Sequence, residues 1–500
     1  MAGIGFALRD LMRRDGLWAL IESQLHGIVA VAGPWFFTIL AMALPALLFD
    51  AQTAGAATSG FVTLLMYIFS ITLTLTSPIA IGMTRHVSDC MYQQRNEEIA
   101  ASFLGALVLG LLTLLPLGAI GMHFLDFPLR TKLLAILCSG MVTMNWIAAP
   151  MLSTIRQFRA LTLAYAAGVL GFWLLLRGLV APDLDDVLLG FTLGMGVTNA
   201  AICALVFHSF PGRSGPLTDV LRSMLRYWDL ALGGLFYGAG IWADKWLMWS
   251  APEHVAMPGG LFALPTYDTV VFIAYITTVP ALSLFVIKAE TSLHEACDGL
   301  YASIQQHASH ARLRIAQDRV IATFHAAGRD VGLVQLCLTA LVLLLPTLIL
   351  DAVKVQHSGV FMFRFCTLGA AFQSGVLMLT IVLHYFDSRR TVLAINALFL
   401  AANLGFSWLS LHLGLRWYGF GYFLAALTTF AVAYLLVNAA LRDMLYLAFV
   451  RQNAAVTDAK VLAPPATVLF EATTEPGPLA PPHMARDAAM RDISKSQSFY

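Results

Sequence analysis

Apolar segments of about 20 residues recur along the whole chain, and this feature restricts the possible folds more than any other. A helix of that length crosses the roughly 30 Å hydrocarbon layer of a membrane. The chain is 59% hydrophobic and 12% charged, about half the charge of an average soluble domain. We therefore predict an all-α integral membrane protein with about twelve transmembrane helices. Their expected ranges are 24–48, 59–84, 99–123, 132–152, 160–180, 187–208, 229–250, 267–288, 331–352, 363–386, 391–413 and 419–440.

Lysine and arginine residues fall into two groups when the connections between these segments are taken alternately. Basic residues are enriched in the cytoplasmic connections of membrane proteins. One set of connections, counted from the N-terminus as far as Arg451, holds 19 of them; the others hold six, which are Arg130, Lys132, Arg177, Lys354, Arg364 and Arg416. This bias predicts that both termini are cytoplasmic. It also supports an even number of helices, because dropping one segment would mix the two groups.

Two long polar connections divide the chain. Residues 209–228 are expected to form a cytoplasmic linker between an N-terminal six-helix bundle at 17–208 and a C-terminal six-helix bundle at 229–450. Residues 289–330 form a cytoplasmic insert within the second bundle. The architecture that follows is two six-helix bundles joined on the cytoplasmic side.

The two ends of the chain differ from the rest. In residues 1–16 apolar side chains share one helical face with arginines beside it, which predicts a cytoplasmic interfacial amphipathic helix. A frayed tail is the alternative. Residues 451–500 are rich in proline, alanine and small polar residues, a composition typical of a disordered cytoplasmic tail.

Four apolar residues in the insert recur at helical spacing. They are Leu293, Cys297, Leu300 and Ile304. Such a stripe belongs to an amphipathic helix. It either packs on helices of the same chain or docks a partner protein, and the sequence favours neither. Partner docking by these four residues is the functional hypothesis.

Short motifs repeat in the same order in both bundles. The sequence TSPIA at 76–80 matches TVPAL at 278–282, and Pro116 in the third segment matches Pro346 in the ninth. Six helices is an even number, so both bundles would run in the same sense, related by an axis along the membrane normal. Duplicated bundles around a central site are a common transporter design.

Asp244 and Lys245 are adjacent in the seventh segment, where charges are costly. Side chains of neighbouring residues on a helix do not face each other, so we expect each charge to have another partner or water. Lysine can extend its head to the membrane interface. Aspartate is too short for this, and a carboxylate within the membrane normally faces a bundle interior or a wet cavity. We predict that Asp244 lines a hydrated path between the bundles.

Several residues are candidate neighbours of these two charges. Trp242 and Trp246 lie on the same side of the helix as Lys245. An aromatic belt at the interface is the alternative role for the tryptophans. Arg364 is a candidate partner for Asp244, and Asp268 is one for Lys245.

Other polar residues within the segments fit a carbohydrate path. Asn145, Trp146 and Asn403 offer the amide groups and aromatic faces that suit sugar hydroxyls and rings. Their alternative role is to hold helices together. Arg85 and Lys288 end matched segments on the cytoplasmic side. They serve there as anchors, or they receive an anionic or sugar-nucleotide-derived substrate.

The sequence also argues against several functions. It has no Walker A loop, no HExxH or GxSxG motif, and no globular region large enough for a glycosyltransferase, so we predict no enzyme and no cofactor. None of the six cysteines forms a CxxC pair, which argues against a disulfide framework or a metal site. The net charge of +1 gives no reason to expect a nucleic-acid partner.

The chain resembles a known family. The opening MAGIGFALRDLMRRDGL, the GPW at 33–35 and the insert after the eighth segment are similar to the Pel exopolysaccharide transporter family, PelG, over about residues 1–450. That family is similar to the multidrug/oligosaccharidyl-lipid/polysaccharide exporter (MOP) superfamily, with twelve helices in two bundles. The resemblance implies an inner-membrane complex in a Gram-negative cell. Its partners would be a cytosolic glycosyltransferase, a cyclic-di-GMP receptor membrane subunit and a further membrane subunit.

These observations lead to one main hypothesis. The chain would move an N-acetylhexosamine-rich exopolysaccharide from the cytosolic glycosyltransferase to the periplasm, through a path between its two bundles. A flippase of lipid-linked oligosaccharides, or a small-molecule/proton antiporter of the same fold, is the first alternative. A membrane scaffold of the synthase complex that transports nothing is the second.

Overall fold

A computed structural model of the chain describes residues 42–45, 47–49, 51–155, 158–212, 215–352, 359–446 and 449. The predicted helix at 1–16 and tail at 451–500 lie outside these residues, as does most of the expected first segment at 24–48. The chain divides into two units, Met1–Arg442 and Asp443–Tyr500. The described part of the second unit includes the short helix α18 (Met444–Tyr446).

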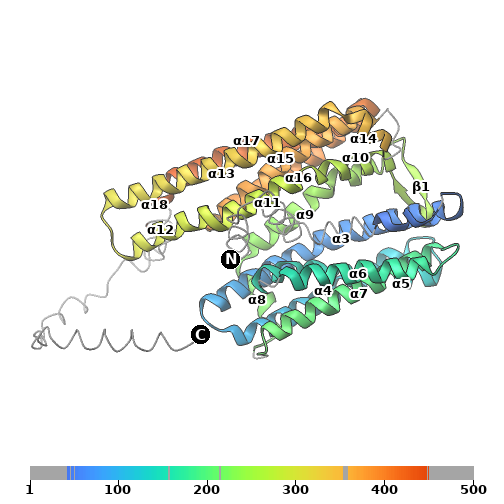
Figure 1. Cartoon of the computed structure of the whole chain (residues 1–500), viewed down its shortest axis with the longest axis horizontal. Helices are drawn as coiled ribbons and strands as arrows, with labels where there is room; N and C mark the ends of the chain where they lie inside the picture. Colours follow the sequence, from blue (N-terminus) through green and yellow to red (C-terminus); the bar gives the residue numbers. More distant parts are fainter. Residues whose placement is uncertain are drawn as a thin grey trace, which may run out of the picture. The chain divides into compact units, whose positions relative to one another are not determined.

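The first half of the first unit is helical throughout (Figure 1). Its helices are α3 (Ala51–Tyr92), η1 (Asn96–Glu98), α4 (Ile99–His123), α5 (Leu129–Ile155), α6 (Phe158–Arg177) and α7 (Leu184–Ser209), followed by α8 (Asp219–Arg226). Aspartate at the N-cap of α7 explains where that helix begins, because the Asp183 carboxylate accepts from the Asp186 amide at 2.8 Å.

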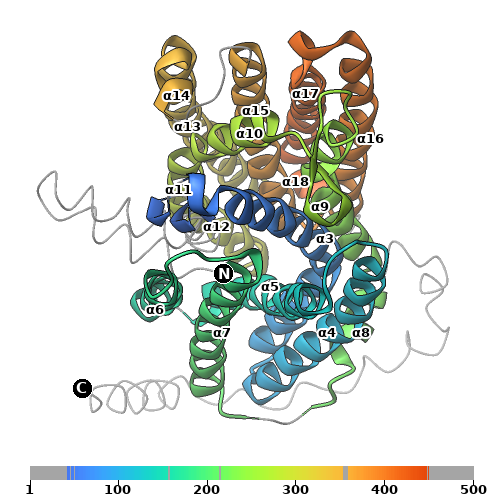
Figure 2. The ribbon, with the colours of Figure 1, turned by 90° about the vertical axis from the view of Figure 1, so that its right-hand side faces the viewer.

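The second half adds a small hairpin to its helices. The elements are α9 (Trp228–Met248), β1 (Val255–Met257), η2 (Pro258–Gly260), β2 (Leu261–Ala263), α10 (Pro265–Ile276), α11 (Val279–Lys288), η3 (Ala289–Leu293), α12 (His294–Gln305), α13 (His310–Leu344), α14 (Pro346–Ala352), α15 (Val360–Tyr385), α16 (Arg389–Leu413), η5 (Leu415–Trp417) and α17 (Phe420–Arg442). Figure 2 shows these helices gathered on one side of α3 and α4–α7 on the other.

Ten helices among the described residues are long and apolar enough to cross a membrane. They account for every expected segment except the first, which is mostly outside the described residues, and the seventh. The seventh is α9, which has the length of a span; its two aspartates and its lysine lower its mean hydropathy. Leucines such as Leu112, Leu163 and Leu435 are exposed on these helices, as expected for surfaces that face lipid.

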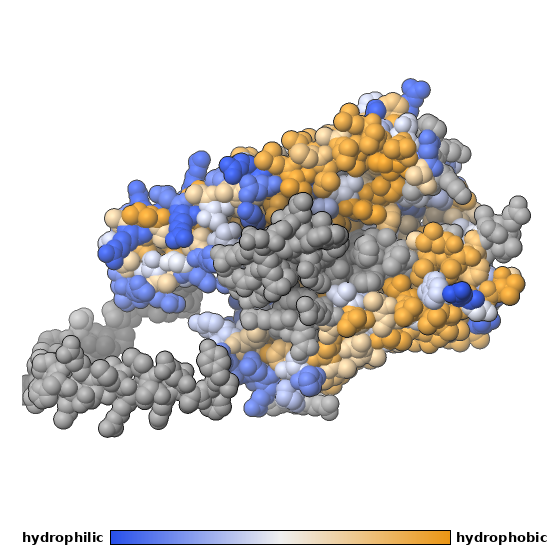
Figure 3. Space-filling view, in the orientation of Figure 1, coloured by the Kyte–Doolittle hydropathy of each residue, from blue (hydrophilic) through white to orange (hydrophobic). Residues whose placement is uncertain are grey.

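The insert at 289–330 is formed by extensions of two membrane-spanning helices, Pro265–Gln305 and His310–Leu344. A π-helical turn, η3, carries α11 without interruption into α12, and α13 begins in the insert and continues into the ninth expected segment. Figure 3 shows hydrophilic residues gathered on this arm and hydrophobic residues along the spans beyond it. The ninth segment was expected to run unbroken to 352, but α13 ends at Leu344 and α14 begins at Pro346. Proline lacks the amide that would continue the helix.

The apolar stripe of the insert packs on the chain itself. Leu293, Cys297 and Leu300 are 2–3% exposed, and Ile304 is half-buried. Leu313 and Val320 of α13, which runs alongside α12, are buried as well. The first three residues are therefore core residues, which is the alternative that the sequence left open. A partner would have to bind the outer surface of this arm.

The expected linker at 209–228 contains the helix α8. It packs against α3, where the Ser223 hydroxyl donates to the Gly82 carbonyl at 3.1 Å. A Cβ atom at position 82 would collide with the side chain of Met224. The α8 part of the linker is thus attached to the first half.

A two-stranded antiparallel hairpin follows α9, and the sequence analysis did not anticipate it. Val255 pairs with Ala263 and Met257 with Leu261. Its turn needs glycine, because Gly259 and Gly260 have φ of 77° and 80°. The carbonyl of Gly259 accepts from the Asp126 amide at 3.1 Å, so the hairpin reaches the α4–α5 connection of the first half.

Helices α3 and α9 form a direct contact between the two halves. A Cβ atom on Gly238 would lie 3.0 Å from the Cα atom of Thr74, and one on Gly234 would collide with Ile81. Gly190 and Gly194 similarly pack on α6. Small residues allow such close approach of helices in membranes. The α3–α9 contact leaves no open space between the halves at this level.

Candidate functional site

Asp244 and Lys245 of α9 are buried, with 0% and 5% of their surfaces exposed. The prediction that they do not contact each other is wrong. The lysine side chain folds back along α9, so that its Nζ atom donates to the Ile241 carbonyl at 2.9 Å. It lies 3.2 Å and 3.3 Å from the two carboxylate oxygens of Asp244. Four methylene groups make this possible, although the two Cβ atoms diverge.

Two further side chains complete the surroundings of the Asp244 carboxylate. The Tyr267 hydroxyl of α10 donates to Oδ2 at 2.7 Å, and Nδ2 of Asn403 in α16 donates to Oδ1 at 3.2 Å. The Ser407 hydroxyl donates to Oδ1 of Asn403 at 2.9 Å. All these helices belong to the second half. We call Asp244, Lys245, Tyr267 and Asn403 the buried charge centre; protein encloses its carboxylate on every side in this conformation.

Aromatic rings surround the ammonium group of Lys245. Its Nζ atom lies 5.5 Å from the ring centroid of Trp242, 5.2 Å from Tyr275 and 5.8 Å from Tyr422. Such contacts stabilise a desolvated cation by about 2 kcal/mol or more. The hydroxyls of both tyrosines donate to Oε1 of Gln373 in α15. The aromatic surroundings of the lysine are therefore held from several helices.

The two predicted ionic partners of these charges lie elsewhere. Asp268 accepts from Nε1 of Trp249 at 3.1 Å and 3.2 Å, and no ion pair joins it to Lys245. Arg364 is exposed on α15, and among the described residues it forms no ion pair with Asp244. The reason is that Lys245, Tyr267 and Asn403 already donate hydrogen bonds to the carboxylate of Asp244. The counter-charge of Asp244 is the adjacent residue, Lys245.

Trp249 connects the charge centre to a cleft between the two halves. Its ring stacks on Tyr67 of α3, with centroids 4.2 Å apart and planes 20° from parallel. The Tyr67 hydroxyl donates to the Phe262 carbonyl of the hairpin at 2.8 Å. The cleft beside this stack has a volume of about 490 Å³. We call it the aromatic cleft; its lining is Tyr67, Ser70, Ile71, Trp246, Trp249, Ser250, His254 and Phe262.

A second contact between the halves lies near the other end of α3. Arg85 is 3.7 Å from Asp387, which precedes α16, and its guanidinium lies over the ring of Tyr227 at 4.9 Å. The Tyr227 hydroxyl donates to Asp89 at 3.1 Å. Arg389 is 3.4 Å from Asp387 and 3.7 Å from Asp229. We call Arg85, Asp89, Tyr227, Asp229, Asp387 and Arg389 the ionic cluster.

The other predicted path residues hold helices together in this conformation. Asn145 accepts from the Tyr165 hydroxyl at 2.9 Å, and Nε1 of Trp146 donates to Thr72 at 3.3 Å. Lys288 pairs with Asp330 of α13 at 3.0 Å, within the second half. The structure thus brings Asp244, Lys245, Trp242 and Asn403 together. It places Trp246 in the aromatic cleft, with Asp268 behind its wall, and leaves Asn145, Trp146, Lys288 and Arg364 apart from both.

The aromatic lining from α3 and the hairpin, and most of the ionic cluster, were not predicted from the sequence. Tyr67, His254 and Phe262 carry no motif, and only the fold brings them to Trp246. Asp229 and Asp387 stand beside basic residues in RYWD and FDSRR. That pattern of mixed charges at the ends of apolar segments could have indicated an ionic contact.

One group of potential metal ligands also arises from the fold. Ligand atoms of His86, Cys90 and Glu98 lie within 4.8 Å of one another, although the sequence predicted no metal site. The Arg95 guanidinium already contacts the Glu98 carboxylate at 2.6 Å. This ion pair, an ionic contact of the α3–α4 turn, competes with a metal for the carboxylate.

The fold is one that solved membrane transporters also have. It is similar to an outward-facing MATE multidrug transporter of the MOP superfamily, with 14% identity and a TM-score of 0.57 over 84% of this chain and 96% of that one. An inward-facing MATE transporter is similar at 15% identity, with a TM-score of 0.55 over 83% of this chain and 99% of that one. A MOP superfamily transporter from Pyrococcus furiosus Vc1 (DSM3638) is similar at 15% identity, with a TM-score of 0.53 over 83% of this chain and 96% of that one. The chain is a multi-pass membrane protein with a MATE-like transporter fold.

The family follows from the sequence match. The model of the PelG family, described as "Putative exopolysaccharide Exporter (EPS-E)", matches residues 1–449. The chain belongs to this family, and it is a transporter-family protein and not an enzyme. No curated protein sequence matches it.

Proposed function

We propose that the chain exports an exopolysaccharide from the cytoplasm to the periplasm along the interface between its two halves. The observation that carries this proposal is the aromatic cleft, which both halves and the hairpin line together. Pockets for organic ligands combine aromatic walls with a few placed polar groups. The rings of Trp246 and Phe262 and the hydroxyl of Ser250 offer this combination to a sugar unit.

The buried charge centre keeps one wall of that cleft in position. Tyr267 and Asp268 are adjacent in α10; the first binds Asp244 and the second binds Trp249 of the cleft wall. A buried ion pair fixes a structure when all its polar atoms are satisfied. Asp244 therefore acts in export through the position of Trp249. Water reaches its carboxylate only if α9, α10 and α16 of the second half move apart.

The ionic cluster must open during export. It ties α3 to α9 and to the start of α16, and it lies 18 residues from Tyr67 along α3, or about 27 Å. With the predicted orientation the cluster is cytoplasmic and the cleft is periplasmic. A polymer passing between the halves has to separate Arg85 from Asp387 before it reaches the cleft. The partial exposure of these ion pairs makes separation cheap, because exposed pairs contribute roughly 0–1 kcal/mol each.

Orientation, membrane and partners complete the proposal. The distribution of basic residues supports cytoplasmic termini, and the resemblance to the PelG family is the reason for proposing an inner-membrane location. From the sequence resemblance we further propose a cytosolic glycosyltransferase as the source of the polymer, with a cyclic-di-GMP receptor subunit and a further membrane subunit beside it. The outer surface of the α12–α13 arm, which carries the exposed Tyr301 and Ile315, is the proposed docking site of the synthase.

Substitutions in the aromatic cleft test the proposal. Trp246→Ala and Phe262→Ala should each lower secreted exopolysaccharide several-fold at unchanged protein abundance. Trp408→Ala and Phe361→Ala remove exposed aromatic rings elsewhere and serve as matched controls. Secretion that is equal in the four variants would contradict a sugar-binding role of the cleft and would favour the scaffold alternative. If secretion by the wild type stops when the proton gradient is collapsed, and the cleft variants secrete normally while the gradient is present, the antiporter alternative is favoured.

A further inference from the structure

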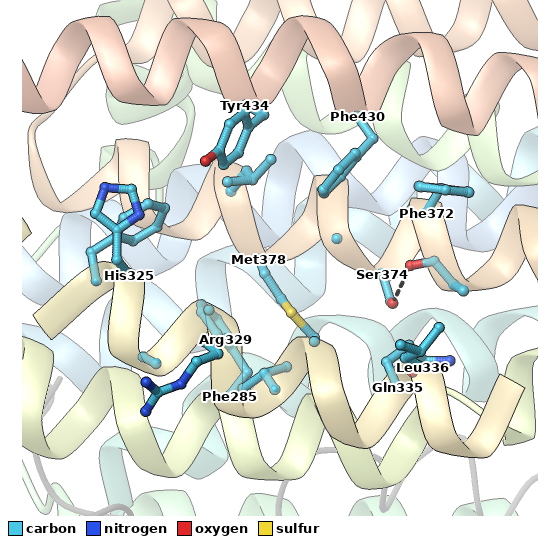
Figure 4. Close-up of a pocket in the computed structure, with 18 of the residues that line it drawn as sticks. Phe285, His325, Arg329, Gln335, Leu336, Phe372, Ser374, Met378, Phe430 and Tyr434 are labelled. Atoms are coloured by element: carbon cyan, nitrogen blue, oxygen red, sulfur yellow. Dashed lines mark hydrogen bonds between the residues drawn. The ribbon is translucent and has the colours of Figure 1, made fainter. Parts of the chain in front are cut away.

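A second cavity lies within the second half, away from the aromatic cleft. It is a groove of about 430 Å³ between α11, α13, α15 and α17. Most of its lining is apolar, including Phe285, Leu336, Phe372, Met378 and Phe430. Figure 4 shows His325 and Tyr434 at one end of this groove and Phe372, Gln335 and Leu336 at the other. We call it the α13 groove.

Two glycines keep one wall of the α13 groove open. Gly328 and Gly332 are one turn apart on α13, and a Cβ atom at either position would meet no described atom within 4 Å. Most other glycines in the spans lie against a neighbouring helix; Gly234 and Gly375, for example, would collide with Ile81 and Phe430. The groove is thus accessible from the side, where lipid surrounds the spans.

A buried polar group inside the groove lacks a partner. Gln335 is 8% exposed; its Nε2 atom donates to Thr339 at 3.1 Å, and its Oε1 atom has no partner among the described residues. An unsatisfied amide in an apolar site costs roughly 1–3 kcal/mol. Rotation of the amide would let Oε1 accept from the Thr339 hydroxyl and present Nε2 to an acceptor in the groove. A ligand with an acceptor at this depth would satisfy it.

The rim of the groove is basic. Arg329 lines it with its side chain 72% exposed, His325 is exposed beside it, and Lys288 stands nearby on α11. Asp330, which pairs with both Lys288 and Arg329, is the acidic group that faces them. From Val331 to Leu344 α13 has no charged residue. The membrane surface therefore lies near Arg329, with the groove running from the headgroup level into the hydrocarbon.

We propose that the α13 groove binds one membrane phospholipid with an anionic headgroup. Its phosphate would contact Arg329 and His325, an ester carbonyl would accept from Gln335, and one acyl chain would lie along Leu336 and Phe372. Arg329 and Gln335 are six residues apart on α13, a rise of about 9 Å, so a ligand that contacts both extends from the membrane surface into the hydrocarbon. The apolar lining fits an acyl chain and the basic rim fits the phosphate.

Lipid binding to the purified full-length protein in detergent tests this proposal. Native mass spectrometry with added phosphatidylglycerol and phosphatidylcholine of identical acyl chains counts the lipids retained. The wild type should bind one phosphatidylglycerol roughly tenfold more tightly than phosphatidylcholine: both lipids offer the phosphate, but the basic rim repels the choline cation of the second. Arg329→Gln should abolish this preference. Gly332→Leu should fill the groove and abolish binding of both lipids.

Control variants keep the test decisive. Gly405→Leu changes an exposed glycine of α16 that also has open space around it, and it should bind lipid like the wild type. If Gly332→Leu does not fold, Gly328→Val fills the same wall. Equal retention of phosphatidylglycerol by the wild type and the filled variants would overturn the proposal. The groove would then be covered by another occupant, such as a helix of a partner membrane protein.

Discussion

The hydroxyl of Tyr267 donates a 2.7 Å hydrogen bond to the carboxylate of Asp244, 23 residues earlier in the chain. This contact joins α10 to α9, and the next residue, Asp268, holds Trp249 in the wall of the aromatic cleft. The two aspartates therefore connect a buried ion pair to the surface that is proposed to receive sugar. Substitutions at the ion pair should act first on stability and, through the cleft, on export.

Removing the negative charge at the centre should destabilise the protein. Asp244→Asn leaves the Lys245 ammonium buried without its counter-charge, and breaking such a pair costs about 3–5 kcal/mol. We expect a lower melting temperature of the purified protein in detergent. The double variant Asp244→Asn, Lys245→Met removes the unpaired charge as well and should recover most of the loss. A single variant that melts like the wild type would show that the pair is not ionised in the folded protein.

The contact between α3 and α9 should tolerate no larger side chain. Gly238→Val places extra atoms against Thr74, and overpacking of this kind costs about 1–3 kcal/mol. Thermal unfolding and the yield of monodisperse protein should both decrease. Gly405→Val, at an exposed glycine with free space, is the matched control and should change neither. Equal behaviour of the two variants would mean that the halves are not in contact at this level.

The arm of α12 and α13 should respond differently at its inner and outer faces. Ile315→Asp changes a residue that is 69% exposed, so it should reduce co-purification with the cytosolic glycosyltransferase while leaving the melting temperature unchanged. Leu293→Ala removes a core side chain and should destabilise the protein by about 2–5 kcal/mol. Undiminished co-purification of Ile315→Asp would exclude this surface as the docking site.

The orientation in the membrane can be measured with single cysteines in a chain without its native ones. Ala51→Cys, at the start of α3, should react with a membrane-impermeant thiol reagent added to whole cells. Tyr92→Cys, at the end of the same helix, should react only after the membrane is permeabilised. The reverse pattern would invert the assignment of the aromatic cleft to the periplasm and of the ionic cluster to the cytoplasm.

Hydropathy alone predicted most of the spans, because a membrane imposes one length and one composition on every crossing helix. It placed the helices around 99–123 and 391–413 almost as the structure has them. It was less informative where a helix carries its own charges. The ends of α11 and α13 continue into the insert as polar arms, and nothing in the apolar pattern distinguishes such an arm from a loop.

The candidate site shows what a helical wheel omits. The wheel gives the direction of the Cβ atom, so it separated Asp244 from Lys245; the flexible lysine stem brought them together. Partners from distant helices, such as Asn403 and Tyr267, depend on how α9, α10 and α16 cross. Tyr67 and Phe262 meet only because the hairpin folds onto α3. No spacing in the sequence encodes these contacts.

The central claim is that the halves separate at the ionic cluster while the polymer passes. In a chain without native cysteines, Arg85→Cys and Asp387→Cys should be joined across the halves with a short bis-methanethiosulfonate reagent, which reduction cleaves. Lys288→Cys with Asp330→Cys, a pair within the second half, is the matched control. We predict that joining the first pair stops exopolysaccharide secretion, that reduction restores it, and that the control pair has no effect. Continued secretion with positions 85 and 387 joined would contradict the account.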